Sequence, residues 1–407
     1  MKKGFLSEYF TGVAAKRLSA VEADPVSSNQ HEFNGVSAMK TMLGAGRQSY
    51  RSRFIYLGED EDDTLTAECF LTWYDAREAH PTRSEYRLYF PSTSVTERAA
   101  AGDLMVIGKR PDGTLQVIIT TAGSTVENQL KWLFGVPVQI ETRFEVRAYE
   151  PDSDVELNFA SRFILDELGV EVEEPDTDRL DGLVERFQGV FPSTAIFSAY
   201  ARDTLPDVVP REDPDAALLA WMEQEEKLFR RLENQGVAER LKQGFGVEDS
   251  ADVDAFISYS LSVQNRRKSR AGYALEHHLD EIFRENEVCY TRQAVTENNA
   301  KPDFLFPGEA EYQDEGFPSS RLSMLGVKTT CKDRWRQILS EAKRIKQKYL
   351  FTLEPAISVN QTSEMGSHHI QLVLPAGLHN TYTREQQAKL VNLQGFIEVV
   401  RGRQHSE

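Results

Sequence analysis

A chain of 407 residues, 40% hydrophobic and with a formal net charge of -17, is large enough for two or three folded domains. The acidic balance argues against general binding to nucleic acid, because repulsion from the phosphate backbone slows the encounter. The three cysteines have no paired spacing, which argues against a disulfide framework and a zinc ribbon and indicates a reducing, cytoplasmic setting. No stretch approaches the length of a membrane span, so we expect no membrane partner.

The first 150 residues consist mostly of short β-rich runs, which predict a compact, mainly-β domain. Arg77, Arg83 and Arg87 lie between or along these runs, with Tyr86 and Tyr89 interleaved. Interleaved basic and aromatic residues are typical of a nucleic-acid-binding surface, and an exposed polar strand face would have the same pattern. The predicted strands are FIYLG, AECFLTW, EYRLYF, LMVIGK and TLQVIIT, with RPDG as a turn between the last two.

An acidic, proline-containing stretch, VEVEEPDTDRLDG, predicts a connection between domains. We place it at residues 171–180, between an N-terminal domain at 1–170 and a C-terminal domain at 181–407. Beyond it, Asp213 can cap a helix that has Pro214 in its first turn. Helical patterns then alternate with the strand-like runs PDFLF, MLGVKTT, YLFTL and IQLVLP. This alternation predicts an α/β fold with a mixed sheet flanked by helices.

Basic residues are concentrated after the run MLGVKTT, in contrast to the acidic chain as a whole. The segment from Lys328 to Lys348 holds eight basic residues and two acidic ones. A bound polyanion would account for this local inversion of charge. Five apolar residues in the segment recur at helical spacing and predict an amphipathic helix: Trp335, Ile338, Leu339, Ala342 and Ile345.

An acid and a lysine stand on two strands that we expect to be neighbours. Asp303 opens the run FLF, and Lys328 follows twenty-five residues later. Cutting a phosphodiester with a divalent ion requires carboxylates for the metal and a lysine near the developing charge. The usual nuclease pattern has an acid two residues before the lysine, where this chain has Gly326. Glu341, thirteen residues after Lys328, can replace that missing carboxylate.

Further residues near this pair have two interpretations each. Glu276 lies close to the apolar face of a predicted helix, where it can orient water or a second ion, or is simply a surface charge. Glu341 could instead pair with Lys343 or Lys348 on a solvated surface. Lys332, just past the end of the strand, can reach a phosphate.

Three segments carry a resemblance to a known family: SVQNRRKSRAGYALEHHLDEIF, TENNAKPDFLFPGEAEYQDEGFP and LGVKTTCKDRWRQILSEAKRI. They are similar to the catalytic domain of EcoRII-type restriction endonucleases, which are PD-(D/E)XK nucleases, and the resemblance covers about residues 180 to 400. It implies that Asp303 and Glu341 bind Mg²⁺ and that Lys328 is catalytic. Three residues match further active-site positions of the family: Glu276, Tyr312 and Lys332.

The resemblance also implies which residues contact DNA. Residues just after the strand read the CC/GG half-sites in the family, and Asp333, Arg334 and Arg336 hold those positions here. Their chemistry fits, because arginine donates to guanine O6 and N7 and aspartate accepts from cytosine N4. A second basic cluster, NRRKSR at residues 265–270, adds Arg266, Arg267 and Lys268 as candidate DNA contacts.

The N-terminal part resembles the family's effector-binding domain through the short segments AKRLSA and TRSEYR. This likeness implies a B3-like pseudobarrel that binds a second copy of the recognition sequence. Candidate contacts there are Lys16, Arg17, Arg83, Glu85 and Arg87.

From this resemblance, we expect the chain to be a type II, and specifically type IIE, restriction endonuclease. It would act as a homodimer on double-stranded DNA, cut both strands at a CCWGG-like site and leave 5′-phosphates. A rival interpretation is a sequence-specific DNA-binding regulator with a non-catalytic nuclease fold, which predicts gaps in the acid and lysine set. Another rival, a structure-specific repair nuclease, would not need a separate β-rich DNA-reading domain.

Overall fold

The computed structural model describes residues 5–24, 31–58, 63–149, 157–172, 181–187, 190–247 and 250–405. The chain divides into two compact units: Met1–Pro175 with Pro355–Gln361, and Asp176–Glu354 with Thr362–Glu407. Most of the predicted connection, residues 173–180, lies outside the described residues. Within the described ranges, no helix is long and apolar enough to cross a membrane.

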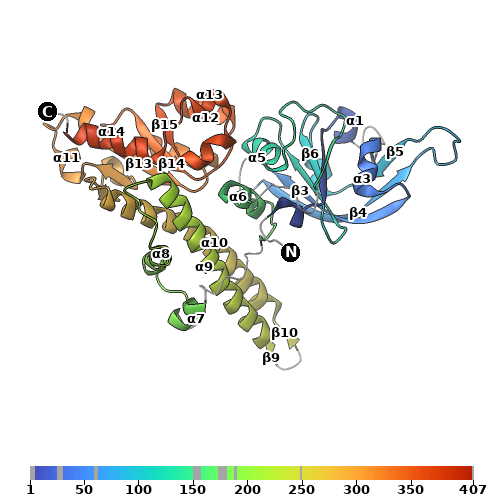
Figure 1. Cartoon of the computed structure of the whole chain (residues 1–407), viewed down its shortest axis with the longest axis horizontal. Coiled ribbons are helices and arrows are strands. Elements are labelled where there is room, and N and C mark those ends of the chain that lie inside the picture. Colours follow the sequence, from blue (N-terminus) through green and yellow to red (C-terminus); the bar gives the residue numbers. More distant parts are fainter. Residues whose placement is uncertain are drawn as a thin grey trace. The chain divides into compact units, whose positions relative to one another are not determined.

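The first unit is built on one sheet, which has eight strands in the described residues (Figure 1). The strand order is β2-β5-β4-β3-β7-β6-β1-β8, and the pairs are antiparallel except for β3 with β7. The predicted mainly-β character of this part is therefore confirmed. The strands are β1 (Gly12–Arg17), β2 (Glu32–Asn34), β3 (Gln48–Leu57), β4 (Thr64–Asp75), β5 (Tyr86–Tyr89), β6 (Leu104–Lys109), β7 (Leu115–Thr120) and β8 (Glu145–Ala148).

Both faces of this sheet are covered by apolar side chains. Phe10 and Phe134 belong to one core cluster, and Phe33, Trp73 and Phe90 belong to the other. The central strands β6 and β7 are consequently buried along most of their length, which explains their continuous apolar sequences. Short helices accompany the sheet: η1 (Leu6–Glu8), α1 (Ala20–Ala23), η2 (Ser37–Met39), α3 (Lys40–Leu43), α4 (Ser94–Arg98), α5 (Thr125–Phe134) and α6 (Phe159–Glu167).

A segment from late in the chain, Pro355–Gln361, completes the first unit. The side-chain amide of Gln129 donates to the carbonyl of Pro355 at 3.1 Å. The backbone N–H of Ser358 donates to Thr125 Oγ1 at 3.0 Å. The first unit is therefore discontinuous in sequence.

The second unit contains a mixed sheet, which confirms the α/β fold predicted for this part. Its strand order in the described residues is β11-β12-β13-β14-β15, antiparallel from β11 to β13 and parallel from β13 to β15. Its strands are β11 (Thr291–Arg292), β12 (Phe304–Phe306), β13 (Ser323–Lys328), β14 (Lys348–Thr352) and β15 (Ile370–Val373). The helical elements around it are α7 (Asp181–Phe187), α8 (Thr194–Asp203), α9 (Pro214–Gln243), α10 (Val253–Glu285), η4 (Glu297–Asn299), α11 (Glu309–Gln313), η5 (Ser319–Arg321), η6 (Lys332–Ser340), α12 (Val359–Ser367), η7 (Ala376–Thr381), α13 (Arg384–Gln387) and α14 (Leu393–His405).

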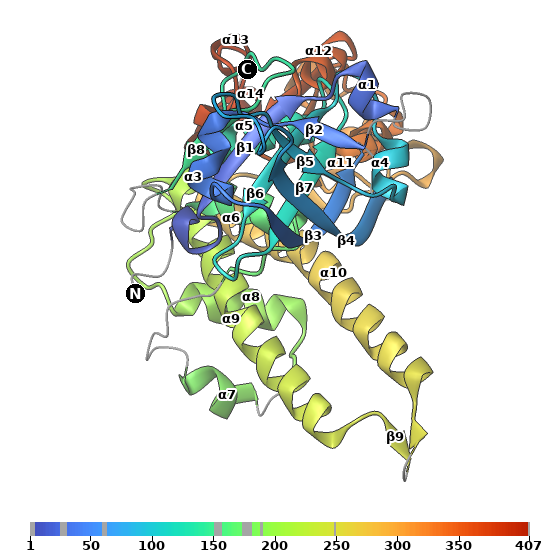
Figure 2. The same cartoon turned by 90° about the vertical axis from the view of Figure 1, so that its right-hand side faces the viewer.

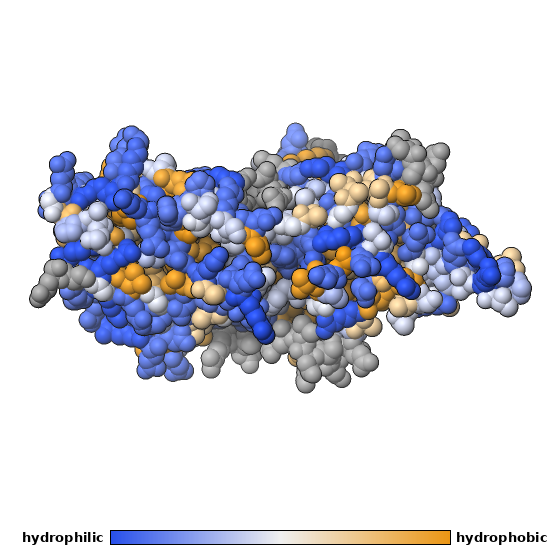
Figure 3. Space-filling view, turned by 90° about the horizontal axis from the view of Figure 1, so that it is seen from above, coloured by the Kyte–Doolittle hydropathy of each residue, from blue (hydrophilic) through white to orange (hydrophobic). Residues whose placement is uncertain are grey.

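Helices α9 and α10 lie side by side as an antiparallel pair, with the two-stranded hairpin β9 (Gly246–Val247) and β10 (Ser250–Ala251) between them (Figure 2). The carboxylate of Asp213 accepts the N–H of Ala216 at 2.9 Å, and Pro214 is the first helical residue, as predicted. The surface in Figure 3 is mostly hydrophilic with small separate apolar patches, as expected when the cores take up most large apolar side chains.

The prediction of an amphipathic helix after β13 is wrong. Residues Lys332–Ser340 form the 3₁₀-helix η6, and Glu341 has extended backbone. Lys348 begins β14 instead of ending a helix, and its ammonium group donates to the carbonyls of Glu341 and Ala342. The 3₁₀-helix buries Trp335 and Ile338, three residues apart, equally well, because it has three residues per turn. The left-handed φ of +47° at Ala342 is incompatible with a continuing helix.

We predict that Asp215 is a major contributor to the stability of the second unit. Its buried carboxylate accepts the N–H groups of Ala376, Leu393 and Gln394 at 2.8 to 3.0 Å, tying α9 to two distant segments. Asp215→Ala would leave three N–H groups, of which that of Leu393 is buried, without their acceptor and should lower the free energy of unfolding by roughly 3 kcal/mol. In urea unfolding, the cap variant Asp213→Ala should cost about 1 kcal/mol. Equal losses for the two variants would contradict the prediction.

Candidate active site

Asp303 and Lys328 meet at the junction of β12 and β13. The antiparallel register pairs Phe304 with Leu325, which places Asp303 across from Gly326. Asp303 Oδ2 accepts the N–H of Val327 at 2.7 Å and lies 3.5 Å from Lys328 Nζ. Both side chains retain limited exposure, 13% for Asp303 and 20% for Lys328. The predicted acid and lysine are thus adjacent and reachable from solvent.

Glu341 joins this pair from the segment that follows η6. The pKa of its carboxyl is raised to about 7, because burial and then the negative charge of Asp303 raise it more than Lys328 and Lys348 lower it. Glu341 Oε2 is buried and has no hydrogen-bond partner among the described residues. A carboxylate in this position favours a proton or a cation as its neighbour.

Glu276 approaches the same site from α10. Burial and the charge of Asp303 raise the pKa of its carboxyl, while Arg292 and Lys328 lower it. Arg292 lies 3.3 Å from Glu276 and 3.4 Å from Asp280. The structure therefore brings four of the predicted active-site residues within electrostatic reach of one another: Asp303, Lys328, Glu341 and Glu276.

The donor set fits a magnesium ion held mainly by water and substrate. The described ranges hold no group of three or more His, Cys, Asp or Glu side chains arranged for a metal. Mg²⁺ often uses one or two carboxylates and completes its shell with waters and phosphate oxygens. Asp303 and Glu341 supply such a pair, and the unpartnered Oε2 of Glu341 is the atom best suited to gain a cation.

Tyr312 lies behind this cluster and supports it indirectly. Its buried hydroxyl donates to the carboxylate of Glu297 at 2.7 Å and accepts the N–H of Arg344 at 3.3 Å. Burial and that carboxylate raise the pKa of Tyr312 to about 12. The N–H of Lys343 also donates to Glu297. Tyr312 thus fixes the segment that follows Glu341, and in this arrangement its hydroxyl serves structure.

The predicted base-reading residues lie on η6. Arg334 and Arg336 are exposed there, and Arg336 donates two hydrogen bonds to Glu364 of α12 at 3.0 and 3.1 Å. The side chains of Lys332 and Asp333 lie outside the described residues. A guanidinium held by a carboxylate is pre-oriented, and it would have to share or exchange Glu364 on contacting a guanine.

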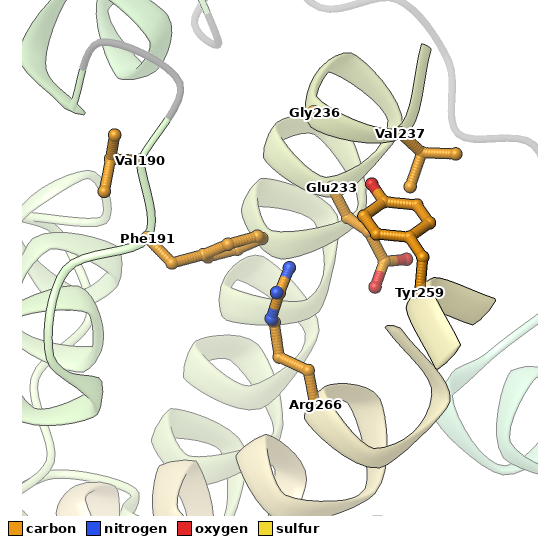
Figure 4. Close-up of a pocket in the computed structure, with 7 residues that line it drawn as sticks. All are labelled: Val190, Phe191, Glu233, Gly236, Val237, Tyr259 and Arg266. Carbon is orange, nitrogen blue, oxygen red and sulfur yellow. The ribbon is translucent and has the colours of Figure 1, made fainter. Parts of the chain in front are cut away.

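The second basic cluster lies beside a cavity of about 370 Å³ between α9 and α10 (Figure 4). The Arg266 guanidinium stacks 4.9 Å from the ring centre of Phe191, and Arg267 donates to the buried carboxylate of Glu233 at 2.6 Å. The side chain of Lys268 is outside the described part. With a rise of 1.5 Å per residue, Arg266 lies roughly 15 Å along α10 from Glu276, so this cluster is separate from the acidic one.

In the first unit, the predicted DNA contact Lys16 lies inside the fold. Its side chain is 2% exposed and paired with Glu22 at 2.6 Å. The sequence did not reveal this, because a lysine in a β-rich run is expected on a surface. Arg17 binds Glu127 at 2.6 Å and the carbonyl of Gly102 at 2.8 Å, which leaves it 26% exposed.

The remaining predicted effector contacts lie at or near β5. Arg83 is exposed, whereas Arg87 is held between Glu32 and Glu85 at 2.5 and 2.6 Å. Glu85 also pairs with Arg77 at 2.6 Å. DNA binding through Arg87 would therefore have to compete with two carboxylates.

Arg292, Gln293 and Glu297 support the acidic site, and no motif in the sequence indicates them. Gln293 donates its side-chain amide to Asp303 Oδ1 at 3.1 Å. These residues lie just before Asp303 in the chain, between the helix with Glu276 and the strand opened by Asp303. This position in the chain is the sequence signal that could have indicated a role in the site.

We predict that Gly326 is required because Ile338 occupies the space beside it. A Cβ at position 326 would lie 2.6 Å from Cγ2 of Ile338. Gly326→Ala should therefore lower the free energy of unfolding by roughly 1–3 kcal/mol, and the double variant with Ile338→Ala should cost at least 1 kcal/mol less than the two single losses summed. Gly46→Ala, at a position with open space, is the control. Strict additivity in denaturant unfolding would refute the steric argument.

We predict that Glu341 makes the metal-free protein less stable as pH rises. Its folded-state pKa of about 7 lies above the ordinary 4.5, so the unfolded chain releases this proton first and stability falls between about pH 4.5 and 7. Glu341→Gln should remove this loss and stabilise the protein at pH 8 by roughly 2 kcal/mol, with little effect at pH 5. Thermal unfolding in chelator would measure this, with exposed Glu398→Gln as control. An unchanged pH dependence in Glu341→Gln would contradict it.

Comparison with known proteins finds a matching family model and a similar curated protein. Residues 229–397 match the family model described as EcoRII C terminal. The chain is 46% identical over 191 residues to the type II restriction enzyme EcoRII of Escherichia coli. That alignment covers 47% of this chain and 46% of the enzyme, so the chain spans about half the length of this relative.

Two solved structures were also matched at low identity. One is metal-depleted Ecl18kI in complex with uncleaved, modified DNA, at 17% identity and a TM-score of 0.46, covering 56% of this chain and 84% of that chain. The other is a complex of the restriction endonuclease PspGI with substrate DNA, at 13% identity and a TM-score of 0.45, covering 58% of this chain and 100% of that chain. The family model and the sequence identity confirm the predicted resemblance, which the family model places at residues 229–397.

Proposed function

We propose that this protein is a type II restriction endonuclease that hydrolyses a phosphodiester bond in each strand of a specific DNA sequence. The observation that carries the proposal is the convergence of Asp303, Lys328 and Glu341 from three separate segments into one partly exposed cluster. The 46% identity to a type II restriction enzyme supports the same conclusion. The complete acid and lysine set also favours an enzyme over a DNA-binding regulator.

The cofactor we propose is Mg²⁺, held by Asp303 and Glu341. When bound there, it would supply positive charge beside the scissile phosphate. Lys328 donates from the same side and can stabilise the negative charge that develops on the phosphate oxygens. Glu276, with its raised pKa, is suited to take up the proton of the attacking water. Hydrolysis of this kind would leave 5′-phosphates.

Recognition is proposed to lie on η6, directly after the catalytic lysine. Asp333, Arg334 and Arg336 would read the outer base pairs of a CCWGG-like site. Residues 181–407 would form the catalytic domain and residues 1–170 a B3-like domain that binds a second copy of the site, as in a type IIE enzyme. Two catalytic domains in a homodimer would cut the two strands.

The central prediction concerns Asp303. Asp303→Ala should abolish cleavage, a loss of at least about a thousandfold, because it removes one of two proposed metal ligands. Sequence-specific DNA binding at saturating Ca²⁺, measured by gel shift, should remain within about tenfold of the wild type. Asp314→Ala, at an exposed aspartate on the same stretch of chain, is the control and should cut normally. Cleavage by Asp303→Ala would show that the assigned site is wrong.

The rival functions are separated by digesting a plasmid of known sequence with Mg²⁺ and mapping the ends. A restriction endonuclease gives fixed positions at one sequence. A regulator gives no cuts, and a repair nuclease gives cuts that follow DNA structure instead of sequence. The mapped ends would also identify the central base pair.

A further inference from the structure

We propose that Gln293 is a positioning residue for Asp303, and this inference rests on the proposed function. The side-chain amide of Gln293 donates to Asp303 Oδ1 at 3.1 Å, and its backbone N–H donates to the carbonyl of Asp303 at 3.2 Å. Gln293 thus hydrogen-bonds the proposed catalytic aspartate through both its side chain and its main chain. This double contact follows from the sheet, since β11 ends at Arg292, which pairs with Phe304 in β12.

The two oxygens of Asp303 have different partners. Oδ2 accepts the N–H of Val327 and lies near Lys328, so it is committed to β13. Oδ1 is held by the Gln293 amide. Because the terminal torsion of aspartate is broad, a carboxylate held at one oxygen can still turn, whereas one held at both is fixed. Each oxygen keeps a lone pair for a cation.

A neutral donor suits this position better than a charged one. An arginine or lysine in place of Gln293 would hold Asp303 more strongly, and its charge would also repel a divalent cation. The amide fixes the orientation of the carboxylate and leaves its charge available. The preceding residue, Arg292, directs its own charge to Glu276 and Asp280 instead. At the end of β11, Arg292 therefore pairs with Glu276 through its charge, and Gln293 holds Asp303 through a neutral hydrogen bond.

The backbone conformation of Gln293 supports the inference and suggests a test of it. Its φ is +49°, in the left-handed region that glycine and asparagine adopt more readily than glutamine. On conformational grounds alone, glycine would be the better residue. Strain of this kind gathers at functional sites, where the side chain serves a purpose other than stability.

The experiment compares Gln293→Gly with the wild type in full-length protein. Gln293→Gly should keep or raise the melting temperature, because glycine adopts the left-handed conformation freely. The Mg²⁺ concentration for half-maximal cleavage should rise by roughly tenfold to a hundredfold, as for other residues that orient metal ligands, while the rate at saturating Mg²⁺ changes little. The Ca²⁺ concentration that supports specific DNA binding without cleavage should rise by a similar factor.

Two further variants make the result specific. Gln293→Asn keeps an amide and suits the left-handed backbone, so it should recover part of the metal affinity. Gln313→Ala removes an amide that bonds the Glu309 carboxylate at 2.9 Å, and it should leave both metal requirements unchanged.

The outcomes distinguish failure of the positioning role from failure of the proposed endonuclease function. Wild-type metal requirements in Gln293→Gly would overturn the positioning role, while an inactive Asp303→Ala would leave the endonuclease proposal intact. A lower melting temperature in Gln293→Gly without recovery in Gln293→Asn would show a merely structural role and would also overturn the inference. Cleavage by Asp303→Ala would overturn the proposed function itself.

Discussion

The burial of the Glu341 carboxyl beside the carboxylate of Asp303 is the constraint on which the candidate site of the second unit depends. One ammonium group, that of Lys328, offsets the repulsion between the two acids in part, and burial still holds the pKa of Glu341 near 7. Folding must therefore stabilise an arrangement that electrostatics opposes. Hydrogen bonds from neutral groups do much of this, such as the N–H of Val327 on Asp303, because they hold the acids without cancelling their attraction for a cation.

The place of the second acid follows from packing. Ile338 fills the volume beside Gly326, where a nuclease of the usual pattern carries a carboxylate. With that space occupied by an apolar side chain, the acid enters from the far end of η6 at Glu341. The same short segment thus covers the strand with Ile338, presents Arg334 and Arg336 to solvent, and places Glu341 beside Asp303 and Lys328. In the function proposed above, the base-reading residues and the second acid would lie on one 3₁₀-helix and its end.

What the sequence predicted well was local. The longer strands of both sheets and the Asp213 and Pro214 helix start depend on neighbouring residues, and the sequence predicts them. Strands β1, β2, β8 and β11 have no counterpart among the predicted strands. The sequence also predicts Asp303, Lys328, Glu341 and Glu276 as site residues, and the fold brings them together. It does not reveal side-chain contacts six or seven residues away: the predicted helix is broken where Lys348 binds the carbonyls of Glu341 and Ala342, and Lys16 is buried against Glu22. Apolar spacing cannot distinguish three residues per turn from 3.6 over one short stretch.

The discontinuity of the first unit has a consequence for how the chain folds as it is made. Gln129 finds its partner at Pro355, 226 residues later. At ribosomal rates of about 5–20 residues per second, the N-terminal sheet waits roughly 10 to 45 seconds for the segment that completes it. For that interval, Thr125 and Gln129 are satisfied by water or by other partners. These contacts of the first unit can therefore form only after most of the second unit has been synthesised.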